Sequence, residues 1–268
     1  MWDTANGPPS SNEISVKECC RVREWVYPPV IGVAVGAFRA LDIRFTITGT
    51  EHIPRSGGAV LAINHVSYPD FLFAGFAARK QGRLVRFMAK QPVFDHRIAG
   101  PLMRGMRHIP VNRSAGADAY AAAIASLRSG EVVGVFPEQT IARSFTMRPF
   151  KTGAARLALE AGVPLIPVVT WGGHRLWTSG RRATLRRHVP VSVTVGAPIT
   201  ATDDESADLL TKHLRDTMSG MLDSAQHNYA DAHLGAGAWW QPQHLGGAAP
   251  GVLEAAEIEQ TRIDGPSQ

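Results

Sequence analysis

A histidine and an aspartate stand five residues apart in the segment INHVSYPDFLF, residues 63–73. His65 follows an apolar run typical of a buried strand, and Asp70 opens a segment with the composition of a helix. Pro69 restricts the preceding residue to extended conformations, so the chain can turn and bring the carboxylate beside the imidazole. A carboxylate on one ring nitrogen fixes the tautomer and leaves the other nitrogen to accept a proton from a hydroxyl group. The spacing also fits a structural loop, in which Asp70 caps its helix and His65 bonds to a carbonyl.

Two more polar clusters follow predicted strands, Asn112 with Arg113 and residues 138–140. The carboxyl ends of strands in an open α/β sheet meet at one edge, so three clusters ending neighbouring strands predict one crevice. The sequence has no GxGxxG turn, Walker loop or GxSxG elbow, which removes the usual support for dinucleotide binding, P-loop phosphoryl transfer and serine hydrolysis. Because no serine or cysteine stands out as a nucleophile, a histidine–aspartate pair suits direct attack by a substrate alcohol.

Strands alternate with helices along most of the chain, which predicts an α/β fold with a mainly parallel mixed sheet flanked by helices on both faces. Strands are expected at 43–49, 57–64, 84–90, 108–111, 131–136, 163–171 and 191–196. Helices are expected at 70–79, 118–128 and 153–161, with an irregular helical segment ending at Met106. Thr202 and Glu205 have the spacing of a capping box, which predicts a further helix from there to about Ala225.

The 268 residues are enough for one sizeable domain, which we assign to residues 42–228. Residues 1–12 are polar and are expected to be mobile. Residues 13–41 are expected to be helical, at 16–25 and 30–41, with a bend at the proline pair 28–29. This helical segment is a candidate for packing on the core or for membrane contact. Residues 229–268 are rich in Gly, Ala, Pro and Gln, and an irregular tail is expected there.

We expect neither a signal peptide nor a membrane-spanning helix. The longest early uncharged stretch, Trp25–Phe38, has 14 residues, whereas a spanning helix needs roughly 20. The only cysteines, Cys19 and Cys20, are adjacent, a geometry poorly suited to a mutual disulfide, and the ten histidines include no HExxH motif. These features predict a cytosolic setting and a protein that needs no metal or redox cofactor.

Basic residues are concentrated in one part of the chain. Residues 139–202 contain nine Lys or Arg and a single acidic residue, Glu160. Within this part, residues 174–188 interleave five arginines with leucine and tryptophan. Such a segment fits a solvated face, and it also suits an anionic lipid surface, where arginine attraction and a buried Trp177 reinforce each other. Nucleic acid is not expected as a partner, because no recognised binding module accompanies the charge.

Four short motifs together resemble those of the glycerolipid acyltransferases, the family of 1-acylglycerol-3-phosphate acyltransferases. Asn64, His65 and Asp70 match the family's NHxxxxD motif, and IPVNR, ending at Arg113, resembles its block ending in arginine. FPEQT at 136–140 is similar to its FPEGT block, and VPLIPV at 163–168 is similar to its proline block. The motifs occur in the family's order over about residues 50–200, which favours the catalytic interpretation of His65 and Asp70.

The resemblance implies a glycerolipid acyltransferase-like fold and roles for several side chains. His65 would be the general base and Asp70 its orienting partner, while the acceptor hydroxyl attacks the thioester of an acyl-coenzyme A or an acyl carrier protein. Arg113, Glu138 and Thr140 would line the acceptor site, where an arginine can grip a phosphate with two hydrogen bonds. For Glu138 a structural use, holding backbone amides or Arg143, is the alternative.

The sequence also departs from the family's pattern. Gln139 stands where the family usually has glycine, and Ile141 stands where an arginine often follows the threonine, a loss for which Arg143 could compensate. Asn112 replaces an acidic residue often found before the motif arginine. Lys90, in contrast, occupies a position where the family often has a basic residue. These departures bear on the identity of the acceptor more than on the chemistry at His65.

The resemblance thus implies an acyltransferase, peripheral to the cytoplasmic face of the cell membrane, that acylates a lysophospholipid, most simply 1-acylglycerol-3-phosphate. The partners would be an acyl thioester donor, the lysophospholipid acceptor and an anionic membrane surface. Two alternatives stay open: a different lysophospholipid or glycolipid acceptor, and a catalytically silent lipid-binding protein.

Overall fold

The computed structural model describes residues 25–112, 116–200 and 205–264. The predicted mobile N-terminus, residues 16–24 of the first expected helix, Arg113 and Thr202 lie outside the described residues. The strands are β1 (Arg44–Thr48), β2 (Ala59–Ile63), β3 (Val85–Lys90), β4 (Ile109–Val111), β5 (Val132–Val135), β6 (Leu165–Trp171) and β7 (Pro190–Val195). The α-helices are α1 (Tyr27–Ala40), α2 (Asp70–Arg79), α3 (Gln91–Asp95), α4 (Ala99–Gly105), α5 (Gly116–Arg128), α6 (Gly153–Ala161), α7 (Ala207–His227) and α8 (Val252–Asp264).

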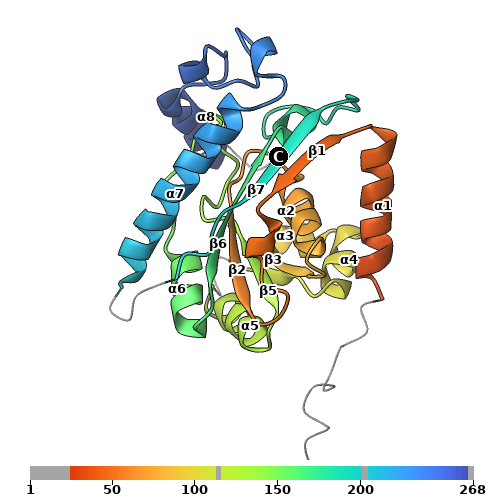
Figure 1. The fold of residues 1–268 in the computed structure, drawn as a ribbon, viewed down its shortest axis with the longest axis vertical. Coiled ribbons are helices and arrows are strands. Elements are labelled where there is room, and N and C mark those ends of the chain that lie inside the picture. The colour runs from red at the N-terminus through yellow and green to blue at the C-terminus, as the bar shows by residue number, and fades with distance from the viewer. Residues whose placement is uncertain (1–24, 113–115, 201–204, 265–268) are drawn as a thin grey trace, which may run out of the picture.

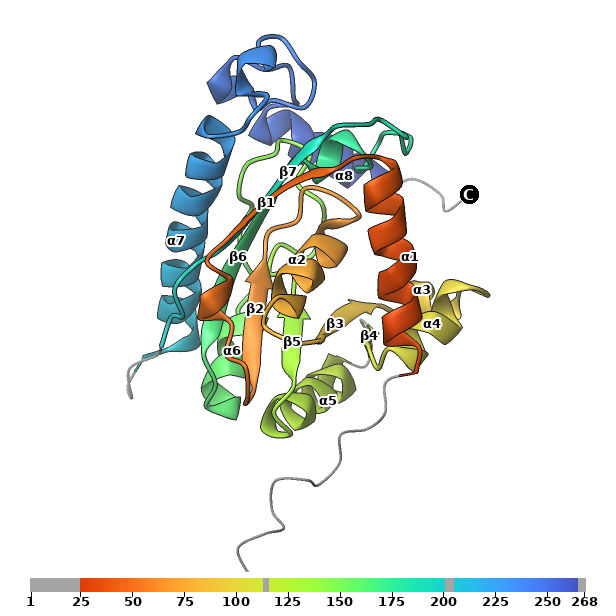
Figure 2. The same ribbon diagram turned by 45° about the vertical axis from the view of Figure 1, so that its right-hand side comes forward.

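The strands form one mixed sheet in the order β1-β7-β6-β2-β5-β3-β4. β6, β2, β5, β3 and β4 run parallel to one another, β7 pairs antiparallel with β6, and β1 pairs parallel with β7. All five residues of β2 are buried, as expected of a central parallel strand covered on both faces. Figure 2 shows the arrowheads of β2 and β5 at the same edge of the sheet, so the loops after these strands meet there.

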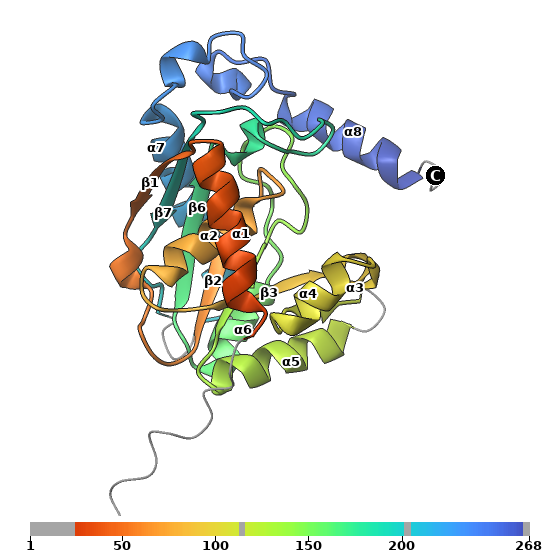
Figure 3. The same cartoon turned by 90° about the vertical axis from the view of Figure 1, so that its right-hand side faces the viewer.

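Helices cover both faces of the sheet, which confirms the predicted α/β fold (Figure 1). Buried alanines and Phe73 of α2, joined by Phe38 of α1, pack against one face. The apolar sides of α5, α6 and α7 pack against the other face, through residues that include Leu127, Leu157 and Leu214. Figure 3 shows α1 lying across the α2 side of the sheet. The sheet and its two helical layers therefore give the loops at the carboxyl edge a rigid base.

The first described helix begins earlier than predicted. α1 starts at Tyr27 and has its two prolines in its first turn, whereas the bend expected between two helices involves residues 16–24, which lie outside the described residues. The first backbone N–H groups of a helix have no intrahelical partner, so proline loses nothing there and its fixed φ suits the start of a helix. α7 likewise differs at its start. Its N-cap is Ser206, whose hydroxyl accepts a hydrogen bond from Leu209 N, instead of the predicted Thr202.

The segment after Asn228 was predicted to be an irregular tail, and this prediction is wrong in part. It contains two short 3₁₀ turns, Ala232–Leu234 and Gln243–Leu245, and ends in helix α8. Tyr229 and Trp240 are buried in the same core cluster as α7. Composition concealed this packing, because a few aromatic residues among many small ones are enough to fix an irregular segment when the core offers them a site.

One buried arginine departs from the solvated face considered for residues 174–188. Arg175 is 3% exposed, and its Nη1 donates to Asp231 at 2.6 Å and to the Tyr229 hydroxyl at 3.1 Å. Its guanidinium also lies 4.4 Å from the centroid of the Trp240 ring. Arg175 therefore holds the C-terminal segment against the sheet, whereas residues 181–188 are exposed.

Candidate active site

Asn64 extends the pairing of β2 with β6 by one residue beyond the end of β2. Its Nδ2 donates to the carbonyl of Thr170 at 3.1 Å, and its Oδ1 accepts the backbone N–H of Thr170 at 2.7 Å. The side chain thus takes the place of a peptide unit and leaves the backbone free to turn away from the sheet. The turn begins at His65, so Asn64 fixes the point where the loop from His65 to Ser67 leaves the strand.

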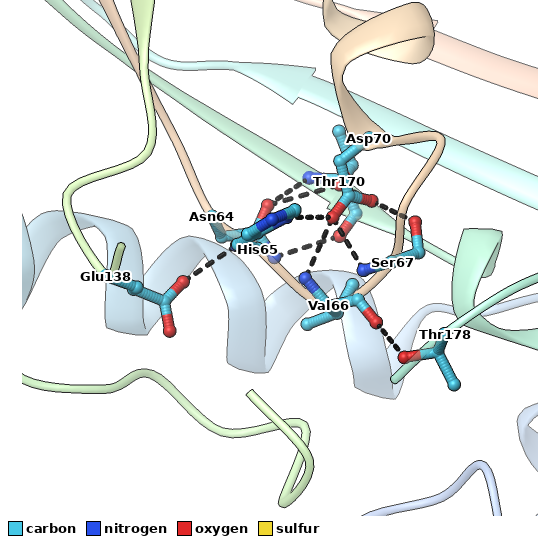
Figure 4. Close-up of polar contacts among 8 residues, drawn as sticks. All are labelled: Asn64, His65, Val66, Ser67, Asp70, Glu138, Thr170 and Thr178. Atoms are coloured by element: carbon cyan, nitrogen blue, oxygen red, sulfur yellow. Dashed lines mark hydrogen bonds and ion pairs between the residues drawn. The ribbon is translucent and has the colours of Figure 1, made fainter. Parts of the chain in front are cut away.

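Asp70 is fully buried and organises the loop from His65 to Ser67 (Figure 4). Its Oδ2 accepts the backbone N–H groups of Val66 at 2.8 Å and Ser67 at 2.7 Å. Its Oδ1 accepts the hydroxyl of Thr170 at 2.9 Å and a very short hydrogen bond from Ser67 Oγ. The carboxylate does not cap its own helix: Pro69 is the N-cap and makes no side-chain cap bond. The capping alternative is therefore wrong.

His65 Nδ1 lies 3.2 Å from Asp70 Oδ2. Because the ionised carboxylate can only accept, Nδ1 carries the proton and Nε2 of the neutral ring is the nitrogen that can accept one. The His65 side chain is 19% exposed, whereas Asp70 is inaccessible. The ring also packs on Phe136 at a centroid distance of 4.3 Å. The imidazole is thus fixed in orientation by Asp70 and Phe136 and stays open to solvent on one side.

Glu138 acts on the same loop through the backbone. Its Oε1 accepts the N–H of His65 at 2.8 Å and its Oε2 accepts the N–H of Arg148 at 3.0 Å. The carbonyl of His65 accepts a further hydrogen bond from Ala142 N at 2.7 Å. Burial raises the pKa of Glu138 to about 8, although the hydrogen bonds from the two N–H groups act to lower it. Glu138 is thus engaged in holding backbone amides, which was the alternative to a role in lining the acceptor site.

The conformation of Gln139 explains why glycine suits this position in related motifs. Its φ is +60°, a left-handed conformation that glycine adopts without the steric cost met by other residues. Ile141 is buried at 6% exposure and cannot offer a charge to the crevice. Arg143 is half-buried and donates to Ser179 Oγ at 3.3 Å. Thr140, also half-buried, follows Gln139 in the turn beside the His65 loop.

Lys90 and Asn112, two of the predicted polar residues, lie towards the far edge of the sheet. Lys90 is exposed at the end of β3, and Asn112 is exposed just after β4. β4 is the edge strand and is separated from β5 by β3. The three clusters therefore do not all end adjacent strands as expected. The clusters at 64–70 and 138–140 do, since β2 pairs directly with β5.

Three residues of this site went unnoticed in the sequence. Ser67 and Thr170 both donate hydroxyl hydrogen bonds to Asp70, and Phe136 packs on His65. Thr170 carried a signal, because it is a polar residue inside the apolar strand VPLIPVVTW. Ser67 and Phe136 belong to the motifs already noted, but their spacing does not reveal what they contact. Among the described residues, no group of three or more His, Cys, Asp or Glu could hold a metal ion.

Comparison with known proteins assigns the class. A family described as "Acyltransferase" matches residues 44–171, a range that includes the dyad, Glu138 and all of β6. The chain belongs to this family, as its motifs predicted. It is 32% identical over 201 residues to a protein of Limnanthes douglasii named 1-acyl-sn-glycerol-3-phosphate acyltransferase, covering 71% of this chain and 66% of that protein. It is 29% identical to a protein of the same name from Bacillus subtilis, covering 49% of this chain and 66% of that protein.

A solved structure supports the same fold. The crystal structure titled 1-acyl-sn-glycerophosphate (LPA) acyltransferase, PlsC, from Thermotoga maritima matches with a TM-score of 0.64 and 21% identity. The match covers 76% of this chain and 80% of that chain. Since the matched part spans just under two thirds of both sequence relatives, these comparisons establish the family and the fold.

Proposed function

We propose that the protein is a 1-acylglycerol-3-phosphate O-acyltransferase. It moves a fatty acyl group from acyl-coenzyme A or an acyl carrier protein to the free hydroxyl of 1-acylglycerol-3-phosphate and so gives phosphatidic acid. The hydrogen bond between His65 Nδ1 and the buried Asp70 carboxylate carries this proposal, because it leaves Nε2 as a general base at an open edge of the sheet. The names of the relatives support the choice of acceptor and of acyl transfer as the reaction.

In the reaction, the acceptor hydroxyl bonds to His65 Nε2 and attacks the thioester carbonyl carbon. As the C–O bond forms, the hydroxyl proton passes to Nε2, and Asp70 stabilises the resulting imidazolium. The tetrahedral intermediate then collapses: the C–S bond breaks, and the leaving thiolate takes the proton from Nε2. The ester and the free thiol leave the site, and His65 returns to its neutral form. No residue of the chain is acylated in this cycle.

Membrane contact through α1 belongs to the same proposal, since the lysolipid acceptor and the phosphatidic acid product reside in membranes. The exposed positions of α1 from 28 to 37 are Pro28, Pro29, Gly32, Val33, Gly36 and Ala37. An uncharged exposed face over most of a helix favours contact with an apolar environment. None of the described helices is long and apolar enough to cross a bilayer. We infer that α1 lies on the cytoplasmic surface of the membrane.

The proposal is tested by acyl transfer from a radiolabelled acyl thioester to a panel of lysolipids. The wild-type protein is expected to acylate 1-acylglycerol-3-phosphate in preference to neutral and glycolipid acceptors. His65→Ala is expected to lower the rate by about 10³-fold, the usual contribution of a general base, while circular dichroism stays unchanged. The control is His213→Ala, at an exposed position of α7. A wild-type rate in His65→Ala would overturn the mechanism, and no transfer by the wild type would favour a lipid-binding protein.

A further inference from the structure

A cavity of about 330 Å³ lies between the loop that follows β6 and the C-terminal segment. Its lining residues are His174, Arg175, Leu176, Gly180, Arg181, Arg182, Thr184 and Trp239. The volume exceeds that of a single phosphate group and falls in the range of sites for small molecules. The proposed chemistry at His65 and Asp70 uses none of these residues.

The lining contains three arginines and no carboxylate. Asp231 offsets the charge of Arg175, but neither Arg181 nor Arg182 forms an ion pair with a carboxylate among the residues that the structure describes. His174 adds no charge, because burial lowers its pKa to about 3. The cavity therefore carries the charge of two exposed guanidinium groups, which suits an anionic ligand.

Two of the three arginines, Arg175 and Arg181, are held in place before a ligand arrives. The Arg181 guanidinium lies 3.9 Å from the centroid of the Trp239 ring, a cation–π contact that limits the mobility of a long side chain. Arg175 is fixed by Asp231 and by the Trp240 ring. A guanidinium that is already positioned loses less entropy on binding and presents its N–H groups as a fork to phosphate oxygens.

The cavity lies on the same edge of the sheet as the dyad. The loop after β6 is joined to the His65 loop by hydrogen bonds from Thr178 Oγ1 to the Val66 carbonyl at 2.7 Å and from Tyr68 N to the Trp177 carbonyl at 3.1 Å. On its other side, Arg143 donates to Ser179. A ligand in this cavity therefore lies close to the loop that carries the proposed general base.

We propose that this cavity binds the phosphate end of a phosphorylated substrate through Arg181 and Arg182. The inference rests on the proposed function, in which both substrates carry phosphate: the acceptor in its glycerophosphate group, and an acyl-coenzyme A donor in its adenosine 3′,5′-bisphosphate end. Both substrates carry phosphate groups that the arginines can recognise. The two possibilities differ in which substrate, the acceptor or the donor, loses affinity when the arginines are removed.

Binding is tested by calorimetric titration of the full chain with glycerol 3-phosphate and with adenosine 3′,5′-bisphosphate. One of these probes is expected to saturate the wild-type protein, and the double variant Arg181→Gln, Arg182→Gln is expected to weaken its binding at least tenfold. The matched control is Arg186→Gln, Arg187→Gln, which removes the same charge from the same loop outside the cavity lining. Absence of binding to the wild type, or equal loss in both double variants, would overturn the proposal.

Steady-state kinetics of the Arg181→Gln, Arg182→Gln variant show whether the cavity binds the donor or the acceptor. The same measurements on His65→Ala test the proposed function separately. A KM increase of at least tenfold for the thioester alone assigns the cavity to the donor, and the same increase for the lysolipid alone assigns it to the acceptor. Unchanged KM values for both substrates would overturn the assignment to a substrate site. His65→Ala is expected to bind the probe as the wild type does while losing transfer, so a failure at the dyad is distinguishable from a failure at the cavity.

Discussion

At the scale of single residues, the most heavily used group in the site is the Asp70 carboxylate. It accepts hydrogen bonds from two backbone amides, two hydroxyl groups and the His65 ring. An ionised carboxylate without such donors would be costly to bury. The same donors that make burial tolerable also fix the loop, so Asp70 positions His65 through the backbone as well as through the ring.

Gln139 offers a stability prediction at this scale. A left-handed conformation costs a residue with a Cβ roughly 1–2 kcal/mol. Glycine avoids this steric cost, but it loses more backbone entropy on folding, so the net gain in stability is smaller. We expect Gln139→Gly to raise the free energy of unfolding by about 0.5–1 kcal/mol in urea denaturation. Ala121→Gly, at an exposed helical position of α5, serves as the control and is expected to lower it by about 1 kcal/mol. A loss of stability in Gln139→Gly would contradict the assigned strain.

At the scale of secondary structure elements, the site depends on the junction of β2 with β6. Asn64 binds both backbone groups of Thr170, and the Thr170 hydroxyl in turn donates to Asp70. The strand that carries the proline block thereby supports the loop that carries the dyad. Two motifs separated by about 100 residues in the sequence are thus parts of one structure.

Thr170→Val tests this junction. Valine keeps the shape of threonine and has a methyl group in place of the hydroxyl, so Asp70 loses one donor, and the longer contact of this hydroxyl with Asn64 Oδ1 at 3.3 Å is lost as well. We expect kcat to fall about tenfold with little change in KM, because the loss is felt when the imidazolium forms. The pH profile of kcat is expected to shift with it, which a purely structural effect would not produce. Thr194→Val in β7 is the control, and equal effects of the two substitutions would argue against a positioning role for Thr170.

At the scale of the whole molecule, the C-terminal segment folds back and packs beside the carboxyl edge of the sheet. The C-terminal segment packs Tyr229 and Trp240 into the core cluster of α7. Helix α8 is tied to the region after the FPEQT block by an ion pair between Arg148 and Glu259. On the opposite face, α1 covers Phe73 through Phe38, and its exposed positions from 28 to 37 are uncharged. Within the described part of the chain, α1 therefore presents an uncharged exposed face over positions 28–37.

Co-sedimentation with vesicles of mixed anionic and neutral phospholipids tests the proposed role of α1. Val33 is 75% exposed on the uncharged face of this helix, and Val33→Glu is expected to lower the bound fraction at least fivefold, since a carboxylate resists transfer to the interface. Leu209→Glu, at a position of α7 that is 60% exposed, is expected to bind as the wild type does. Equal binding by both variants would show that α1 does not face the membrane.

The sequence alone predicted the elements whose signals are local. Helices at 70–79 and 153–161 have the predicted bounds, because the residues that start and end them are neighbours in the chain. The alternation of strands and helices predicted the mixed sheet for the same reason. The motif around His65 and Asp70 was also found in the sequence, since the short loop at Pro69 limits where the carboxylate can lie.

Only the tertiary structure decided what those residues contact. Glu138 holds the His65 amide, Thr170 donates to Asp70, and Trp239 packs on Arg181. Each of these contacts joins segments that lie far apart in the sequence. Such contacts depend on the order of the strands in the sheet and on how the loops pack. Local propensity carries no information on strand order, and it carries little on irregular segments that are fixed by packing. The His65–Asp70 pair was therefore visible in the sequence, while its supporting contacts and the cationic cavity beside it required the fold.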